Sequence, residues 1–252
     1  MKVKDILNRV TLLYHDKDFI RLTQEEYLRL LDDAIMQLIL LRPDANEKRT
    51  VEKLVAGARQ QIPEGALTLV DVYCNKRWVE NLKSYRDGKP VFQVSRKDLD
   101  YWDKNWYANT DPSVYEIDEF AFDTRTPTRF WVNPPVDPSQ NVYVEMGCSY
   151  TPTTYSGRDD PNYDEIFNED LFLNDRYKMA LTNYMLYLCY STDSTSQYDK
   201  AISDKYFQMF IQGLQLEEMA AISANPHIKE FTASGLGIHK INAPAQAPAN
   251  QG

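Results

Sequence analysis

Apolar residues recur at helical spacing near the start of the chain. In residues 3–14 this spacing predicts a short amphipathic helix. Thr23 and Glu26 have the spacing of a capping box, so we expect a second helix to begin there. Arg42 precedes Pro43 and is expected to end it, because the residue before a proline is pushed out of the α region. This second helix is expected to bury Tyr27, Leu31, Ala34, Ile35 and Leu38.

The same spacing returns in the last third of the chain. Asn174 is a good N-cap and predicts a helix directly after it. The apolar face of that helix consists of Tyr177, Ala180, Leu181, Tyr184 and Leu188. A second capping box at residues 194–197 predicts a long helix that continues to about Ile222 and ends before Asn225-Pro226.

Between these helical patterns the chain carries strand and turn signals. The candidate strands are residues 67–73, 91–94, 114–122, 130–132 and 142–148, separated by clusters of Gly, Pro, Asp and Asn. In the last of them Val142, Val144 and Met146 occupy alternate positions, which is the period of a strand with one buried face. Several short strands spaced by turns predict an antiparallel sheet or a sandwich.

Residues 50–62 are ambiguous. Their apolar positions fit a helix, and periodicity alone favours it. Ala56-Gly57 and Pro63-Glu64-Gly65 are typical of turns, so the alternative is a β hairpin that turns at Ala56-Gly57 and returns along residues 59–62.

Together the patterns predict an α+β fold. Helices from the N- and C-terminal ends are expected to form one helical bundle, with an inserted antiparallel β domain and an extended C-terminal tail. The expected boundaries are 1–49 and 164–225 for the bundle, 50–163 for the β domain and 226–252 for the tail.

The tail places apolar side chains among glycine, serine and lysine. They are Phe231, Leu236, Ile238 and Ile241. Burying them would contribute about 6–12 kcal/mol, whereas ordering roughly fifteen residues costs roughly 15 kcal/mol or more in backbone entropy. We therefore expect the tail to be disordered in the isolated protein and to order on a partner that adds backbone pairing, as in strand addition to a sheet edge. The alternative is a dispensable linker end.

Composition narrows the class of protein. The 252 residues are 43% hydrophobic and 26% charged, which is typical of a soluble globular protein. We expect neither a signal peptide nor a membrane span, since no apolar run reaches the necessary length. The net charge of −9 argues against tight non-specific DNA binding but suits a wall past which DNA slides. Cys74, Cys148 and Cys189 lack metal-ligand spacing and are expected to be buried small hydrophobes.

Motifs for catalysis and cofactors are missing from the sequence. It has no glycine-rich nucleotide loop, no His-Glu-x-x-His and no Gly-x-Ser-x-Gly, so we expect no cofactor, no metal and no catalytic residue. His15, His227 and His239 have no evident partners for a triad or a metal site. The acidic run at residues 159–165 lacks the ligand spacing of an EF-hand and is interpreted as a solvated loop.

Two alternatives to an assembly role stay open at this point. Trp102 and Trp106 lie in an aromatic cluster at residues 101–107, and an exposed pair would make a carbohydrate-binding β module of a tail or cell-surface assembly. We favour packing of both rings against the sheet, with the polar residues between them facing water. Asp118 and Glu145 would suit a two-carboxylate hydrolase if they lay roughly 5–10 Å apart in a cleft.

Segments along most of the chain point to one family when they are taken together. They are residues 5–10, 40–45, 54–63, 67–72, 114–118, 130–135 and 142–150, followed by the helix pair that begins near Tyr177. Their order and spacing resemble the head-to-tail connector (adaptor) proteins of tailed bacteriophages. In such adaptors the segment matching Leu54-Val55-Ala56-Gly57-Ala58-Arg59-Gln60-Gln61-Ile62-Pro63 is a hairpin limb, which shifts the prediction for residues 50–62 to a β hairpin.

The resemblance implies a structural virion protein and no enzyme. Many copies, commonly twelve, would form a homo-oligomeric ring beneath the portal protein, extend the DNA channel and give the tail proteins an attachment platform. DNA would pass without sequence-specific binding, and no membrane would be involved. The implied location is the virion neck, after synthesis in the host cytoplasm. Contacts with the portal or a neighbouring subunit are expected from the tail residues Phe231, Leu236, Ile238 and Ile241.

Overall fold

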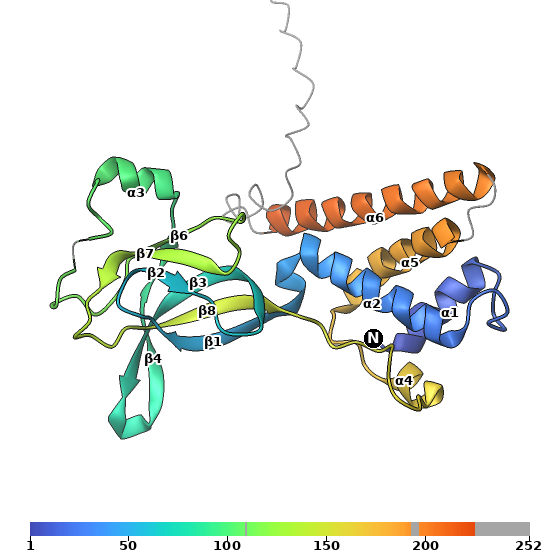
Figure 1. Cartoon of the computed structure of the whole chain (residues 1–252), viewed down its shortest axis with the longest axis horizontal. Helices are drawn as coiled ribbons and strands as arrows, with labels where there is room; N and C mark the ends of the chain where they lie inside the picture. The colour runs from blue at the N-terminus through green and yellow to red at the C-terminus, as the bar shows by residue number, and fades with distance from the viewer. Residues whose placement is uncertain (109, 193–196, 225–252) are drawn as a thin grey trace, which may run out of the picture.

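The computed structural model describes residues 1–108, 110–192 and 197–224. Its longer helices and its strands lie in two parts of the molecule, with the strands contributed by the middle of the chain (Figure 1). We call residues 1–46 and 163–224 the helical part and residues 47–150 the β part. The predicted α+β class is confirmed, whereas the predicted domain boundaries stay a prediction.

The helical part is built around one central helix. Its long helices are α1 (Val3–Leu13), α2 (Gln24–Leu41), α5 (Lys178–Thr192) and α6 (Gln197–Ala224). Its short elements are the 3-10 turns η1 (Pro43–Asn46) and η3 (Asp175–Tyr177) and the helix α4 (Tyr163–Asn168). Since α5 packs against α1, α2 and α6, it holds the first and last helices of the chain together.

The predicted caps explain where the helices begin. The Thr23 side chain accepts a hydrogen bond from the Glu26 N–H while the Glu26 carboxylate accepts one from the Thr23 N–H, so the capping box is formed. The Asn174 side chain accepts the Arg176 N–H at 3.0 Å and starts η3, which runs into α5. Of the capping box predicted at residues 194–197, only Gln197 lies within the described residues.

A single apolar core joins helices from both ends of the chain. The predicted α2 residues are fully buried, as expected: Tyr27, Leu31, Ala34, Ile35 and Leu38. The same core contains Val10 of α1, Leu181 of α5 and Phe210 of α6. Burial of such side chains contributes about 1.5–3 kcal/mol each, so this core fixes the mutual positions of the helices.

A buried carboxylate shapes the loop between α1 and α2. Asp16 is 3% exposed, and its oxygens accept the N–H groups of Ile20, Arg21 and Leu22 at 2.8, 3.0 and 3.1 Å. The Tyr27 hydroxyl of α2 donates to the same carboxylate at 3.0 Å. Burial alone raises the pKa of Asp16, but these donors outweigh it and lower the pKa.

The β part contains two four-stranded sheets, in the orders β1-β8-β3-β4 and β2-β7-β6-β5. The strands are β1 (Glu47–Lys53), β2 (Gly57–Gln61), β3 (Ala66–Val79), β4 (Ser84–Pro90), β5 (Phe92–Gln93), β6 (Glu119–Phe122), β7 (Arg129–Val136) and β8 (Tyr143–Tyr150). All pairs are antiparallel except β5 with β6, so the predicted antiparallel arrangement is correct for most of the part. The helix α3 (Arg96–Trp102) and the turn η2 (Glu80–Leu82) complete it.

Alternation along β8 places its side chains as expected. Val142, just before the strand, and Val144 and Met146 within it are each at most 2% exposed and belong to the core between the sheets. Other predictions were incomplete. Residues 114–122 form a strand only from Glu119 onward, and β4 was not predicted.

The interpretation of residues 50–62 needs a correction. The segment is extended, so the helix favoured by periodicity is wrong. The hairpin is wrong as well, because β1 pairs with β8 while β2 pairs with β7 in the other sheet. The chain therefore crosses between the sheets through Leu54, Val55 and Ala56. Leu54 is buried in the core between the sheets, whereas Ala58 is buried in a separate cluster with Leu99 of α3 and Trp106. Burial in these two different places produced the helix-like spacing.

Polar anchors join the two parts where the chain enters and leaves the β part. The Asn46 side chain donates to the Tyr150 carbonyl at 2.7 Å, which ties the start of β1 to the end of β8. Beyond β8, the Asp32 carboxylate of α2 accepts the N–H groups of Tyr155 and Ser156 at 2.8 and 2.9 Å. The returning chain is thus held against α2 before the helical part resumes.

Candidate functional site

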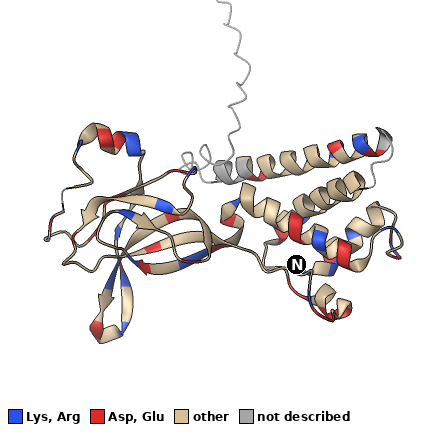
Figure 2. Ribbon diagram, in the orientation of Figure 1, with Lys and Arg blue, Asp and Glu red and all other residues tan. Residues whose placement is uncertain are grey.

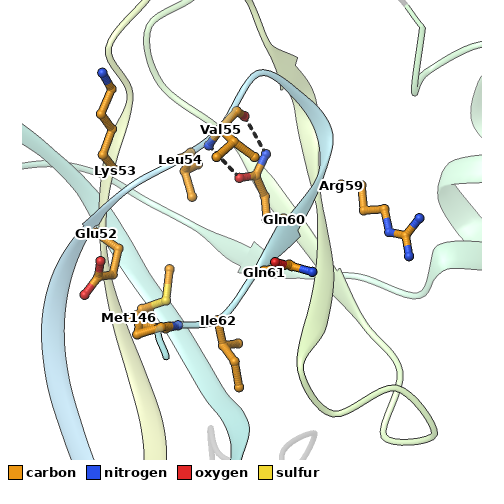
Figure 3. Close-up of a pocket in the computed structure, with 10 residues that line it drawn as sticks. Glu52, Lys53, Leu54, Val55, Arg59, Gln60, Gln61, Ile62 and Met146 are labelled. Atoms are coloured by element: carbon orange, nitrogen blue, oxygen red, sulfur yellow. Dashed lines mark hydrogen bonds between the residues drawn. The ribbon is translucent and has the colours of Figure 1, made fainter. Parts of the chain in front are cut away.

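A groove opens in the β part between the edge strands β1 and β2 (Figure 3). Its volume is about 310 Å³. Leu54, Ile62 and Met146 give it an apolar floor, while Glu52 and Arg59 are among the polar residues of its walls. Each of the two strands lies at the edge of its own sheet, so the groove runs between two strand edges that no described strand pairs with.

Gln60 fixes the shape of this groove. Its side-chain amide accepts the Val55 N–H at 2.8 Å and donates to the carbonyls of Val55 and Gly57 at 2.8 and 2.9 Å. Figure 3 shows the paired bonds to Val55. An amide side chain suits this place because it offers an acceptor oxygen and two donor hydrogens on a separate nitrogen. Gly57 has φ +97, a conformation that favours glycine.

The lining of the groove suits binding rather than chemistry. It brings together no histidine, cysteine or serine, and its charged members are Glu52, Lys53 and Arg59. A nucleophile with an adjacent base is therefore not among the lining residues. An apolar floor between two strand edges instead fits an extended segment of another chain, which would add backbone pairing to side-chain contact.

One cluster among the described residues has the composition of a metal site. Cys74, Asp87 and Glu145 bring their ligand atoms within 4.8 Å of one another. The Lys76 ammonium occupies the same place, pairing with Asp87 and lying 2.6 Å from Glu145. Its hydrogen bonds to the two carboxylates raise the pKa of Lys76, and burial raises the pKa of the Cys74 thiol. The lysine supplies the positive charge, so the cluster is a structural link between β3, β4 and β8.

The carboxylates considered for a hydrolase have separate ion-pair partners. Glu145 pairs with Lys76, whereas Asp118 lies 3.8 Å from Lys89 and its side chain is 63% exposed. Neither belongs to the lining of the groove. The geometry gives no support to a two-carboxylate mechanism, which needs both groups in one cleft.

The aromatic cluster on and after α3 is divided between core and solvent. Trp106 is 5% exposed, and its ring N–H donates to Asp100 at 2.9 Å. Trp102 is 61% exposed, so the expectation that both rings pack against the sheet was right only for Trp106. Both residues border a pocket of about 220 Å³, yet Trp102 and Trp106 do not form the expected platform of two exposed rings. This weakens the carbohydrate-binding alternative.

A polar network covers the face of the β1-β8-β3 sheet that points away from the core between the two sheets. Gly147 of β8 leaves a space that Glu47 fills, since a Cβ at this position would lie 2.2 Å from Glu47 Oε1. The Tyr73 hydroxyl donates to Glu47 at 2.6 Å, and the Arg49 guanidinium lies 3.9 Å from the centre of the Tyr73 ring. Burial, reinforced by the Glu47 charge, raises the pKa of Asp71 to about 6.

Exposed apolar side chains gather on two further elements. On α6, Leu216 and Met219 are each 66% exposed. On the β3–β4 hairpin, which projects from the β part in Figure 1, Leu82 is 52% and Trp78 46% exposed. Large exposed apolar residues in clusters are typical of surfaces that bind other proteins. Sequence analysis missed the α6 group because helical spacing alone does not separate a buried face from an exposed one. It missed the hairpin group because β4 was not predicted.

The binding residues predicted in the tail lie outside the described residues. They are Phe231, Leu236, Ile238 and Ile241. The three cysteines, which were expected to be buried, lie within the described residues. Cys148 and Cys189 are buried and Cys74 is half-buried, and all three are free thiols. None of the described helices combines the length and apolar composition needed to cross a membrane.

These features define an α+β protein with a groove between β1 and β2 and exposed apolar side chains on α6 and the β3–β4 hairpin. A comparison with protein families then gives the family. The model described as SU10 adaptor protein matches residues 1–229, so the chain belongs to this family, and the resemblance to phage adaptors is confirmed. Adaptor membership implies a structural role in a bacteriophage particle. No curated protein matches the chain.

Proposed function

We propose that the chain is the subunit of a head-to-tail adaptor ring. The ring lies beneath the portal in the virion neck, extends the DNA channel and gives the tail its attachment platform. The observation that carries this proposal is the family match over residues 1–229. It is supported by the division into a helical part with one rigid core and a β part with open strand edges.

Closure of a ring sets a physical requirement. Each subunit must present one patch to its neighbour on one side and a different, complementary patch on the other. The helical part suits this requirement because α5 locks the helices at both ends of the chain into one body. The groove between β1 and β2 and the β3–β4 hairpin are then available for portal or tail proteins.

The acidic surplus suits a channel wall. The net charge is −9, and Asp159, Asp160, Asp164 and Glu165 are exposed on α4 and the loop before it. Figure 2 shows this red concentration at one edge of the helical part. Like charge lowers the affinity for phosphates, so DNA passes without being retained.

The tail serves in this proposal as an arm that docks on the portal or a neighbouring subunit. Its apolar residues Phe231, Leu236, Ile238 and Ile241 are too few to order it alone, as the energies above indicate. Many tails on one ring would engage together, which raises the effective affinity of each.

Electron microscopy of the purified protein, alone and mixed with portal rings of the same virus, tests the proposed function. We expect portal rings that carry an additional ring of density on one face. Protein that never decorates portal rings would contradict the proposal.

Deletion of residues 226–252 tests the role of the tail separately. We expect the shortened chain to lose co-sedimentation with portal rings while keeping the thermal unfolding of the full chain. Undiminished co-sedimentation would assign the tail no docking role and leave the adaptor proposal in place.

A further inference from the structure

The last helix is much longer than the helix on which it packs. α6 has 28 residues and its neighbour α5 has 15. Leu214 is the last of its described side chains to be buried, yet α6 continues to Ala224, about 15 Å further along the axis. In Figure 1 this end of α6 extends toward the β part. Glu217 on this end is half-buried near Arg42, whereas Leu216 and Met219 face outward, so one face of the end has no partner among the described residues.

The exposed side chains of α6 follow the spacing of a helix–helix contact. Met209, Gln212, Leu216 and Met219 recur at intervals of three, four and three residues, which is the spacing of the buried positions in a coiled coil. Met209 is 39% exposed, and Leu216 and Met219 are each 66% exposed. We call these four residues the α6 stripe. Its period matches another helix better than a strand or DNA.

Gly213 lies beside the α6 stripe, and no contact with the described residues explains it. Outside its own helix backbone, a Cβ built at this position would meet no atom of the described residues within 4 Å. Glycine in the interior of a helix costs stability relative to alanine, so alanine would be the better residue for the isolated subunit. A second helix that approaches the backbone closely at this point would account for the glycine.

The distribution of charge on the chain indicates which molecule would supply that second helix. A chain with a net charge of −9 repels its own copies unless they meet at a face poor in carboxylates. The α6 stripe contains no acidic residue, and the next position toward the N-terminus on the same face is Lys205. The exposed faces of α2 and of the loop before α4 carry acidic residues such as Asp33 and Asp159. A second copy therefore offers helices whose charge complements this face.

We propose that the α6 stripe is a contact between neighbouring copies, in which it packs against the helical part of the next subunit. The proposal rests on the proposed ring. Four side chains cover less than the roughly 800 Å² per partner of a standard stable interface. The contact therefore forms when copies are concentrated or held side by side on a ring, where many weak contacts act together.

Photocrosslinking tests which molecule covers the α6 stripe. A benzoylphenylalanine at Met219 of the full chain would be irradiated in concentrated protein and on portal rings. We expect a chain–chain product that mass spectrometry maps to α1, α2 or α4 of another copy. A product with the portal only, or no chain–chain product in either sample, would overturn the proposal. Decoration of portal rings is scored separately by electron microscopy and decides the proposed function.

Two substitutions measure the contact itself. Leu216→Glu should raise the protein concentration for half-maximal assembly about tenfold, because it places a charge in the contact between the α6 stripe and the next subunit. Gly213→Ala should raise the thermal stability of the isolated subunit while weakening assembly about threefold, a combination that a purely structural role would not produce. Leu82→Glu, at an exposed apolar residue of the β3–β4 hairpin and outside the helical part, is the matched control and should assemble like the unmodified chain. Unchanged assembly of Leu216→Glu, or equal loss with Leu82→Glu, would contradict the proposal.

Discussion

The helical part and the β part place their buried polar groups differently. In the helical part Asp16 accepts hydrogen bonds from three backbone N–H groups and from Tyr27, and the pKa of its carboxyl is lowered. In the β part Asp71 lies near Glu47, and burial raises the pKa of its carboxyl to about 6. The surroundings of Asp16 favour its charged form, whereas those of Asp71 favour the neutral form. The helical part thus holds a carboxylate as a hydrogen-bonded anion, whereas the β part holds one whose surroundings disfavour the anion.

Truncation of the helical core should have the largest effect. Ile35→Ala removes a fully buried side chain of α2 and is expected to lower the free energy of unfolding by about 2–5 kcal/mol, because it leaves a cavity. Urea unfolding followed by circular dichroism measures this loss. Leu40→Ala, on the same helix at 62% exposure, is the control and should change stability by less than about 0.5 kcal/mol. Similar losses from both would contradict the single core of the helical part.

Removal of the Asp16 carboxylate should be nearly as costly. Asp16→Ala leaves three N–H groups and the Tyr27 hydroxyl without their acceptor and is expected to cost on the order of 3 kcal/mol. Since the folded pKa lies below the unfolded value of 3.8, the contribution is present above that pH and lost as the pH falls through the folded pKa. Thermal unfolding between pH 5 and about pH 2 should therefore depend less on pH in Asp16→Ala than in the unmodified chain. An identical pH dependence would show that Asp16 is not the group involved.

In the β part, Gln60→Ala should have a smaller, local effect. It removes three hydrogen bonds that shape the crossing from β1 to β2, at an expected cost of about 1–3 kcal/mol. Hydrogen exchange at the Val55 amide should accelerate, while amides of α2 keep their protection. Gln61→Ala, at the exposed neighbouring position, is the matched control. Faster exchange throughout α2 would contradict the division into two parts.

Asp71→Asn should change the stability of the protein least, and it should raise the stability where the other substitutions lower it. The folded pKa of about 6 lies above the unfolded value of 3.8, so the folded state favours the protonated carboxyl. Its stabilising contribution is full below about pH 4 and is lost as the pH rises through about 6. The amide avoids burying a charge and is expected to stabilise the protein at pH 7.5 by on the order of 1–2 kcal/mol. Thermal unfolding at pH 4 and pH 7.5 measures it, and a loss of stability at pH 7.5 would contradict the assignment.

The helical part was largely predictable from the sequence because its signals are local. The Thr23–Glu26 capping box and the apolar face of α2 each lie within a few turns of one helix. The β part depends on pairing between distant residues. The partner of β1 lies about a hundred residues away in β8, so nothing near residues 50–62 indicates that this segment crosses from one sheet to the other.

Exposed surfaces escaped prediction for a different reason. β4 is exposed along both faces, so it lacks the alternation by which strands are recognised. Leu216 and Met219 fit the same helical period as buried residues, and only the short length of α5 leaves them uncovered. Trp102 and Trp106 lie four residues apart, yet the end of α3 at Trp102 separates their environments.

The hydrogen bond between Asn46 and Tyr150 bears on how the chain tolerates change over evolution. It joins the points at which the chain enters and leaves the β part, and these points lie side by side because β1 and β8 are paired neighbours, roughly 4.8 Å apart. A segment whose two ends meet in this way can lengthen, shorten or be exchanged without moving the helices that carry it. New tail partners can thus be accommodated by replacing one contiguous stretch of the gene while the helices are inherited unchanged.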